Sequence, residues 1–303
     1  MKISTQTDPL VPKLGIEKAM ALISYGGFEA IDFGFDYSPL TSPMFREWDD
    51  KQFADYFKHA RKTAADNGIE IHQCHAPFPL KVYDPEKDPI MLEAAVKSIY
   101  ASAHMECPYI IIHPAMHPSF HYGNNYDECL RTNVEFYSSL VPALRDTGVS
   151  LCIENMWACD VDTGKKIATT CSRAEWMVDM IDTLNEMHGG EIFTACLDVG
   201  HCAISGTYAH DMVRTLGKRI HTLHVHDNNG YDDSHQLPGL GKINWLHFMN
   251  ALKDVGYNGT FNFEAGNFFD TWSNPALYDD EVLRAASKMM FAVGSSLVKI
   301  LEN

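Results

Sequence analysis

Eight apolar, strand-like segments alternate with helix-like segments along the whole 303-residue chain. This alternation constrains the fold, because strands separated by helices pair in parallel and become buried on both faces. Glycine follows most of the predicted helices, as at a helix C-cap, so the returns to the next strand are short. The predicted strands are Lys2–Thr5, Glu29–Phe35, Ile69–His75, Tyr109–His113, Ser150–Glu154, Phe193–Asp198, Ile220–His226 and Thr260–Glu264. The predicted helices are Ile16–Tyr25, Asp50–Asn67, Pro89–His104, Asp127–Asp146, Arg173–His188, Tyr208–Leu216, Trp245–Val255 and a closing helix within Asp280–Leu301.

Eight strand–helix units in a chain of this length predict an α/β fold, a single-domain (β/α)₈ TIM barrel over residues 1–303. A doubly wound open sheet is the alternative, but no glycine-rich phosphate loop follows the first strand. The long irregular segments all follow strands, and in a barrel that face carries the active site. These segments are Asp36–Asp49, Ala76–Asp88, Pro114–Tyr126, Asn155–Ser172 and Asp227–Asn244.

Charge and cysteine usage narrow the functional classes. With 24 Lys and Arg against 40 Asp and Glu, the chain has a formal charge of −16, so we expect no nucleic-acid partner. The eight cysteines are scattered without a CxxC pair, which favours reduced thiols in a cytoplasmic protein over the alternative of a disulfide framework. The N-terminal segment MKISTQTDPL has no apolar signal core, and no apolar run reaches membrane-spanning length, so we expect neither secretion nor membrane insertion.

Four of the predicted strands end in or near a carboxylate or imidazole, at Glu154, Asp198, His224 and Glu264. Buried strands rarely end this way unless the side chains converge on a cation, because an unpaired buried charge is costly. A structural ion pair with Lys or Arg is the alternative, but the neighbouring strand ends supply histidines. Mixed carboxylate and imidazole ligands suit Mn²⁺, Zn²⁺, Fe²⁺ or Co²⁺. His226 shares a strand face with His224, so spacing alone does not choose between them.

Further candidate ligands or substrate contacts surround these four. His75 and His113 end the third and fourth predicted strands, and His201 follows Asp198 in the run DVGH. Asp233 and His235 form a D-x-H pair in the loop after the seventh strand.

Several of these segments together resemble a known family. They are HAPF from His75, IIIHPA around His113, IEN at Glu154, LDVGH ending at His201, HVHDN from His224, HQLPGLGKINW from His235 and FNFEA around Glu264. In this order they resemble the xylose isomerase-like TIM-barrel superfamily. This superfamily includes sugar and sugar phosphate isomerases and ketose 3-epimerases. It also includes apurinic endonuclease family 2, whose members are the type-four apurinic endonucleases. The segments cover about two thirds of the chain.

The resemblance implies a divalent metal, Mn²⁺, Zn²⁺, Co²⁺ or Mg²⁺, held by Glu154, Asp198, His224 and Glu264, and no nucleotide cofactor. His224 is chosen by the family's H-x-x-D pattern, which ends here at Asp227. One departure is the turn Gly239-Leu240-Gly241, where the family often has an acidic residue between the glycines.

The implied function is isomerisation or epimerisation of a small sugar or sugar phosphate, by proton transfer through an enediolate between Glu154 and Glu264. His201 is expected to contact substrate oxygens, and Trp157 and Lys242 to bind substrate. Three lysines, Lys165, Lys166 and Lys242, are candidate phosphate contacts. The aromatic residues predicted at the barrel mouth are Trp48, Phe78, Tyr83, Phe120, Tyr122, Tyr126, Trp157 and Tyr231.

Other functions fit the same scaffold. The endonuclease branch implies a phosphodiester hydrolase with three zinc ions, whose ligand set adds His75, His113, His201, Asp233 and His235, but the charge of −16 disfavours a DNA substrate. A lyase or dehydratase shares the metal chemistry, and fold does not fix reaction. A binding barrel without catalysis would be expected to lack Glu154 or Glu264. The closing helix and long loops are compatible with a homodimer.

Overall fold

The computed structural model describes residues 1–302 except 9, 36–37, 118–124, 161 and 269–273. Eight strands, all paired in parallel, form one sheet in the order β10-β1-β2-β3-β4-β5-β8-β9. A parallel bridge between Val225 and Phe263 joins the two edges, so the sheet closes into a barrel. The strands are β1 (Ile3–Gln6), β2 (Ala30–Gly34), β3 (Glu70–His75), β4 (Tyr109–Ile111), β5 (Ser150–Glu154), β8 (Phe193–Asp198), β9 (Ile220–His224) and β10 (Phe261–Phe263).

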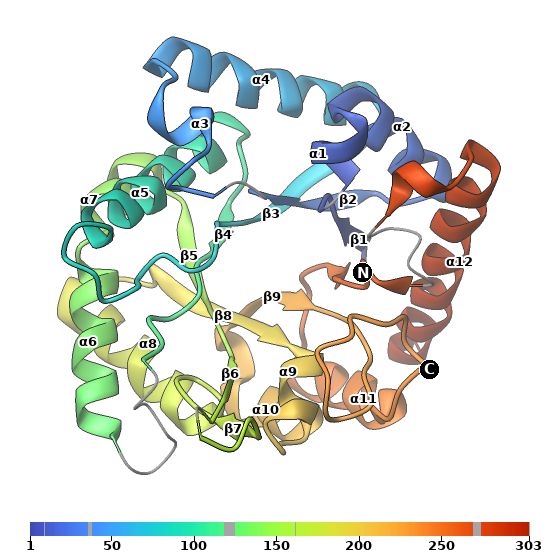
Figure 1. The fold of residues 1–303 in the computed structure, drawn as a ribbon. Coiled ribbons are helices and arrows are strands. Elements are labelled where there is room, and N and C mark those ends of the chain that lie inside the picture. The colour runs from blue at the N-terminus through green and yellow to red at the C-terminus, as the bar shows by residue number, and fades with distance from the viewer. Residues whose placement is uncertain (9, 36–37, 118–124, 161, 269–273, 303) are drawn as a thin grey trace.

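Helices surround the barrel as an outer ring, so the predicted single-domain TIM barrel is confirmed (Figure 1). The larger helices are α2 (Ile16–Gly26), α4 (Asp50–Asp66), α5 (Asp88–His104), α6 (Tyr126–Ser138), α7 (Val141–Thr147), α8 (Ala174–His188), α10 (Ala209–Leu216), α11 (Trp245–Val255) and α12 (Asp280–Val298). Shorter elements are α1 (Leu10–Leu14), α3 (Pro43–Arg46), α9 (Val199–Ile204), and 3₁₀ turns at Gly217–Arg219, Pro275–Leu277 and Lys299–Glu302. No described helix is long and apolar enough to cross a membrane.

Three local predictions were wrong. The segment Asp36–Asp49, expected to be irregular, contains the short helix α3. The helix expected over Asp127–Asp146 is two helices, α6 and α7, and Pro142 lies in the first turn of α7, where its missing N–H does no harm. The segment Asn155–Ser172, expected to be irregular, contains an antiparallel hairpin of β6 (Trp157–Cys159) and β7 (Lys166–Ala168).

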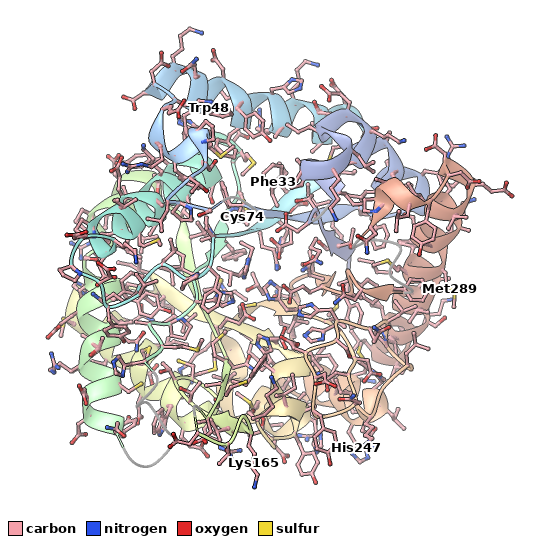
Figure 2. The ribbon with its side chains drawn as sticks, viewed as in Figure 1. Phe33, Trp48, Cys74, Lys165, His247 and Met289 are labelled. Atoms are coloured by element: carbon pink, nitrogen blue, oxygen red, sulfur yellow. The ribbon has the colours of Figure 1, made fainter. Side chains whose placement is uncertain are left out.

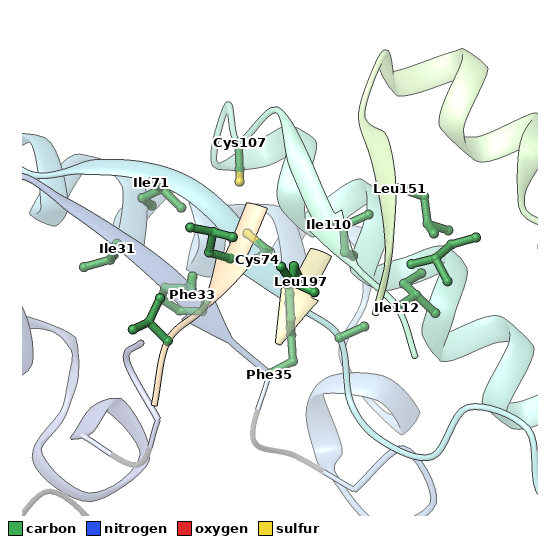
Figure 3. Close-up of a cluster of buried hydrophobic side chains, with 14 of the residues drawn as sticks. Ile31, Phe33, Phe35, Ile71, Cys74, Cys107, Ile110, Ile112, Leu151 and Leu197 are labelled. Atoms are coloured by element: carbon green, nitrogen blue, oxygen red, sulfur yellow. The ribbon is translucent and has the colours of Figure 1, made fainter. Parts of the chain in front are cut away.

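Apolar side chains on the outer face of the sheet pack against the helices and form the main core. Phe33 on β2 contacts Phe35 and, from α4, Phe57, with ring centroids 6.0 and 6.2 Å apart. Figure 3 shows Ile31, Ile71 and other buried side chains of this layer on neighbouring strands. Burial of such side chains stabilises a fold by roughly 25 cal/mol per Å² of apolar surface.

The inside of the barrel is different, because its upper part is polar. A small buried cluster of Ile111, Cys152 and Cys196 fills the middle. Polar side chains of other strands are buried in the same interior, where Gln73 donates to Asp32 at 2.9 Å. Buried polar groups of this kind need partners, and they lie against the residues that end the strands.

Candidate functional site

Four strand-end side chains converge at one mouth of the barrel. Glu154, Asp198 and His224 are the last residues of β5, β8 and β9, and Glu264 follows β10 directly. Because the strands are parallel, all four lie at the same edge, and their potential ligand atoms lie within 4.8 Å of one another. The first three side chains are buried, and that of Glu264 is 14% exposed.

His224 is oriented by Asp32, which was not among the predicted site residues. Its Nε2 donates to Asp32 Oδ2 at 3.0 Å, which leaves Nδ1 facing Glu154 Oε2 and Glu264 Oε2, each at 3.3 Å. A carboxylate behind an imidazole in this way fixes the tautomer of a metal-ligating histidine. The sequence signal was an aspartate within the otherwise apolar run Glu29–Phe35.

The donor set at this mouth fits a divalent cation. Glu154 Oε2, His224 Nδ1 and Glu264 Oε2 are buried and make no hydrogen bond with any described residue. Buried polar atoms are normally satisfied, so three such atoms that converge without a well-formed hydrogen bond fit a cationic partner between them. Two carboxylate oxygens with an imidazole nitrogen suit a transition-metal dication or Mg²⁺ better than a thiolate-preferring structural zinc.

The two glutamates differ in their electrostatic surroundings in the metal-free protein. Burial opposes ionisation of Glu154, yet the adjacent imidazoles of His224 and His113 hold its pKa well below the ordinary value. Burial raises the pKa of Glu264, and the nearby charge of Glu154 raises it further. The imidazoles of His224 and His235 lower this pKa but do not outweigh the other effects. Carboxyl groups with pKa values pushed apart are suited to opposite roles in proton transfer.

His75 and His113 approach Glu154 from the neighbouring strands. Their Nε2 atoms lie 3.3 Å apart and 3.5 and 3.0 Å, respectively, from Glu154 Oε2. His75 ends β3, and His113 lies two residues beyond β4. The structure therefore brings both predicted residues to the edge of the central four.

His201 and His235 form a second cluster around Asp233. His201 Nε2 lies 3.1 Å from Asp233 Oδ2, and His235 Nε2 lies 3.4 Å from Oδ1. Burial opposes protonation of both histidines, but neighbouring carboxylates raise the pKa of His201 well above its ordinary value and that of His235 to about 9. His201 Nδ1 donates to the carbonyl oxygen of Asn155 at 2.8 Å. The side-chain amide of Asn155 also holds the backbone of Asp198, donating from Nδ2 to its carbonyl oxygen and accepting at Oδ1 from its N–H.

His226 lies between the two clusters. Its Nε2 contacts both carboxylate oxygens of Asp198, at 3.1 and 3.0 Å, and its ring stacks on His235 with centroids 4.1 Å apart. His224 and His226 thus point to the same side, as strand alternation predicts, but His224 alone of the two belongs to the central group.

A cavity of about 460 Å³ opens above these residues. Of the two predicted substrate contacts, Trp157 lines it and donates from Nε1 to Asp233 Oδ2 at 3.2 Å. Lys242 is not among the lining residues, because it lines a neighbouring pocket of about 300 Å³ and lies over the ring of Tyr231. The cavity is lined by Phe78, His113, Met116, His117, Glu154, Met156, Trp157, Ala158, Cys159, His201, Asp233, His235 and Glu264.

Among the other predicted mouth aromatics that the structure describes, Phe78 lines this cavity and the rest do not. Trp48 packs on Tyr56 beside α3 and α4 (Figure 2), and Tyr126 packs on Trp176 at 4.8 Å between ring centroids. Tyr83 and Tyr231 also do not line the cavity. Phe120 and Tyr122 lie outside the described residues.

Curated relatives match parts of the chain. The uncharacterized protein MJ1311 of Methanocaldococcus jannaschii is 27% identical over 202 residues, which cover 65% of this chain and 64% of that protein. The D-psicose 3-epimerase of Enterocloster bolteae is 29% identical over 109 residues, which cover 33% of this chain and 32% of the enzyme. This chain therefore matches less than two thirds of the length of either relative.

Solved structures match along nearly the whole chain. A D-tagatose 3-epimerase-like protein superposes with a TM-score of 0.70 at 21% identity, covering 99% of this chain and 98% of the other. The IolI protein with a bound zinc atom superposes with a TM-score of 0.70 at 15% identity, covering 98% of each chain. At these identities the likeness supports the fold. The family model for the xylose isomerase-like TIM barrel matches residues 21–286, and the chain belongs to that family.

Proposed function

We propose that this protein is a divalent-metal-dependent epimerase or isomerase of a small sugar. The observation that carries the proposal is the pair Glu154 and Glu264, two carboxylates at the barrel mouth whose Oε2 atoms each lie 3.3 Å from His224 Nδ1. The name of the D-psicose 3-epimerase relative supports the same class of reaction. Such a reaction removes a proton from the carbon next to a carbonyl and returns one elsewhere or from the other face.

Glu154, Asp198, His224 and Glu264 would hold the metal. A dication bound there would polarise the carbonyl and hydroxyl oxygens of the sugar and make the adjacent carbon more acidic. The zinc atom of the IolI structure supports a metal at this mouth. Asp32 keeps the Nδ1 lone pair of His224 directed at the site.

The two glutamates would exchange the proton. One carboxylate would take the proton from the sugar carbon, and the substrate would pass through an enediolate. The other carboxylate, which contacts His224 Nδ1 as the first does, would return a proton from the opposite side. In the reverse direction the roles exchange, as microscopic reversibility requires.

The surrounding imidazoles would bind the hydroxyl groups. His113, His201 and His235 line the cavity, and the raised pKa values of His201 and His235 make both of them donors. Donors placed where negative charge develops stabilise an enediolate more than the ketose. Lysine contacts to a substrate phosphate find no support in the cavity lining.

The direct test is conversion of ketohexoses by the purified, Mn²⁺-loaded protein. We expect an equilibrium mixture of two epimers or isomers to form from at least one ketose, and chelation of the metal to stop the reaction. Absence of conversion across D-fructose, D-psicose, D-tagatose and D-sorbose with Mn²⁺, Co²⁺, Mg²⁺ and Zn²⁺ would contradict the proposal.

A metal-dependent phosphodiester hydrolase is the second candidate, because three clusters of ligand-type residues share the mouth. Beside the central four, these are His75 with Glu154 and His224, Asp198 with His201 and His226, and His226 with Asp233 and His235. Three bound Zn²⁺ per chain and chelator-sensitive cleavage of abasic-site DNA would favour this candidate. One metal per chain and no cleavage would favour the sugar enzyme.

A cytoplasmic location and a homodimer complete the proposal. All eight cysteines are free and seven of them are buried, as suits a reducing compartment. Light scattering of the purified protein at micromolar concentration measures the assembly, and a monomer there would contradict the dimer.

A further inference from the structure

We propose that the cavity takes a neutral ketose with an apolar or aromatic substituent on the end remote from Glu154 and Glu264, and not a sugar phosphate. The inference rests on the proposed function and names the class of substrate for the same site. It starts from the division of the cavity into two unlike halves.

The floor of the cavity is polar and its wall is apolar. Glu154, Glu264 and Asp233 contribute carboxylates to the floor, together with imidazoles that lie against them. The wall is contributed by the loop after β3, the segment beyond β4 and the hairpin strand β6 with the residue before it. Its residues are Phe78, Met116, Met156, Trp157, Ala158 and Cys159.

No lysine or arginine among the described residues lines this cavity. The residues outside that description add none, because neither type occurs at their positions in the sequence. Every lysine and arginine of the chain is therefore excluded from the cavity lining. A phosphate at the remote end of a sugar would lie near three carboxylates, and the imidazoles of His201 and His235 are already engaged by Asp233. It would lack the Lys or Arg that usually recognises it.

None of the three lysines that the sequence offers for a phosphate lines the cavity. Lys242 lines the neighbouring pocket. Lys165 is exposed and lies at the outer edge of the molecule (Figure 2). Lys166 does not line the cavity, but its Nζ lies 3.8 Å from the centroid of the Trp157 ring and 3.3 Å from Cys159 Sγ. These contacts with two wall residues, one of them a cation–π contact, already engage this lysine.

The size of the cavity points the same way. At about 460 Å³ it falls in the range of sites that hold drug-sized ligands, and an unsubstituted ketose is much smaller than these. With its reacting carbons over the two glutamates, a ketose would leave the wall uncovered. Phe78 is 49% exposed there and offers its ring to an incoming group. Aromatic and thioether side chains gain most from contact with an apolar or aromatic substituent.

The test measures binding and proton exchange separately on the holoprotein. The probes are the D-ketohexoses, their 6-O-benzyl ethers and their 6-phosphates. Calorimetry gives the dissociation constants, and NMR in D₂O gives uptake of deuterium at the carbon next to the carbonyl. We expect the best benzyl ether to bind about tenfold or more tightly than its parent ketose, and the 6-phosphate to bind more weakly than the parent.

Two substitutions at one exposed position sharpen the test. Phe78→Ser should lower the preference for the benzyl ether over the parent about tenfold, and Phe78→Lys should shift the preference toward the 6-phosphate. Leu277→Ser and Leu277→Lys are matched controls, since Leu277 is 74% exposed and does not line the cavity. Both controls should keep the wild-type preferences.

The outcomes separate the inference from the proposed function. Tighter binding of the 6-phosphate than of the benzyl ether, no binding of any probe, or unchanged preference in both Phe78 variants would overturn the inference. If the benzyl ether is preferred but no sugar takes up deuterium, the inference stands and the proposed function fails. If deuterium exchange is seen with the 6-phosphate preferred, the proposed function stands and the inference fails.

Discussion

The hydrogen bond from His224 to Asp32 determines which nitrogen of this imidazole faces the site. With Nε2–H donated to Asp32, its Nδ1 faces Glu154 Oε2 and Glu264 Oε2, each at 3.3 Å. The same Oδ2 of Asp32 also accepts a hydrogen bond from Gln73 Nε2, at 2.9 Å, inside the barrel. The orientation of a candidate metal ligand therefore depends on a residue that never reaches the cavity.

Asp32→Asn should weaken metal binding without removing a ligand. An amide can present its NH₂ group to His224 and so favour the wrong tautomer, and loss of such a partner typically costs 10- to 100-fold in metal affinity. Titration of the metal-free variant with Mn²⁺ measures the effect. Asp182→Asn, which removes a surface ion pair with Arg219, is the control. Equal affinities for Mn²⁺ in the wild type and Asp32→Asn would contradict the role of Asp32.

Glu154→Gln and Glu264→Gln should each reduce turnover by roughly 10² to 10⁴-fold, the usual contribution of a positioned acid or base. The amide oxygen can still ligate, so metal content must be measured alongside the rate. Either variant with near-normal activity and a full metal load would remove that glutamate from proton transfer.

Residue identity at the strand ends was predictable, and partners within the barrel were not. Glu154, Asp198 and Glu264 stand out because charge is unusual at the end of an apolar strand. Asp32 carries the same signal in weaker form, inside a strand. The wall residues Met116 and Met156 lie in loops, where no periodicity indicates which way a side chain points.

At the scale of elements, the loops that follow the strands form the cavity. The helices pack against the outside of the barrel and keep the strand ends in place. The β6–β7 hairpin brings Trp157 to the cavity and to Asp233. Helix α9 begins directly at Asp198, whose side chain accepts from His201 N, so one residue both ends a strand and caps a helix. Placement of His201 beside Asp198 follows from this junction.

Asp49→Ala should destabilise the fold by about 1 kcal/mol, the usual cost of losing an N-cap. The side chain of Asp49 accepts a hydrogen bond from the backbone N–H of Gln52 at 2.7 Å. The side-chain oxygen of Gln52 in turn accepts from the backbone N–H of Asp49 at 3.0 Å, and the two bonds together cap α4. Urea unfolding measures the change, with Asp50→Ala in the first turn as control. Equal losses in the two variants would show that the cap contributes nothing beyond the helix dipole.

Long periodic elements were predictable and short ones were not. The eight strand–helix units are found with ends within a few residues of the prediction, since apolar pattern and glycine caps mark them. The hairpin strands have three residues each, too few for alternation to show. The break between α6 and α7 depends on a proline that a first turn tolerates, so sequence pattern alone does not place it.

At the scale of the whole molecule, the barrel encloses a polar upper interior. The proposed metal ion would offset the negative charge of the carboxylates at its mouth. The core outside the sheet is apolar and continuous, and it supplies stability independently of the site. The closure was predictable from eight repeating units. The reaction was not, because fold does not fix it.

Metal binding should stabilise the folded protein, since the four proposed ligands come from four strands or their ends and converge only in the folded state. A cation at 100 times its dissociation constant should add about 2.7 kcal/mol to the free energy of unfolding. Thermal unfolding with and without Mn²⁺, Co²⁺, Zn²⁺ or Mg²⁺ tests this. A double variant, Glu154→Ala with His224→Ala, should lose the shift. Identical unfolding of the wild type with and without each metal would contradict the site.

Proton transfer by Glu154 and Glu264 is tested most directly by the fate of solvent deuterium. The Mn²⁺-loaded protein is incubated in D₂O with the ketose that it converts, and both sugars are examined by NMR at the carbon next to the carbonyl. We expect solvent deuterium at that carbon in the product and, with time, in the recovered substrate. Conversion without any deuterium uptake would indicate a direct hydride shift and would contradict the two-carboxylate mechanism.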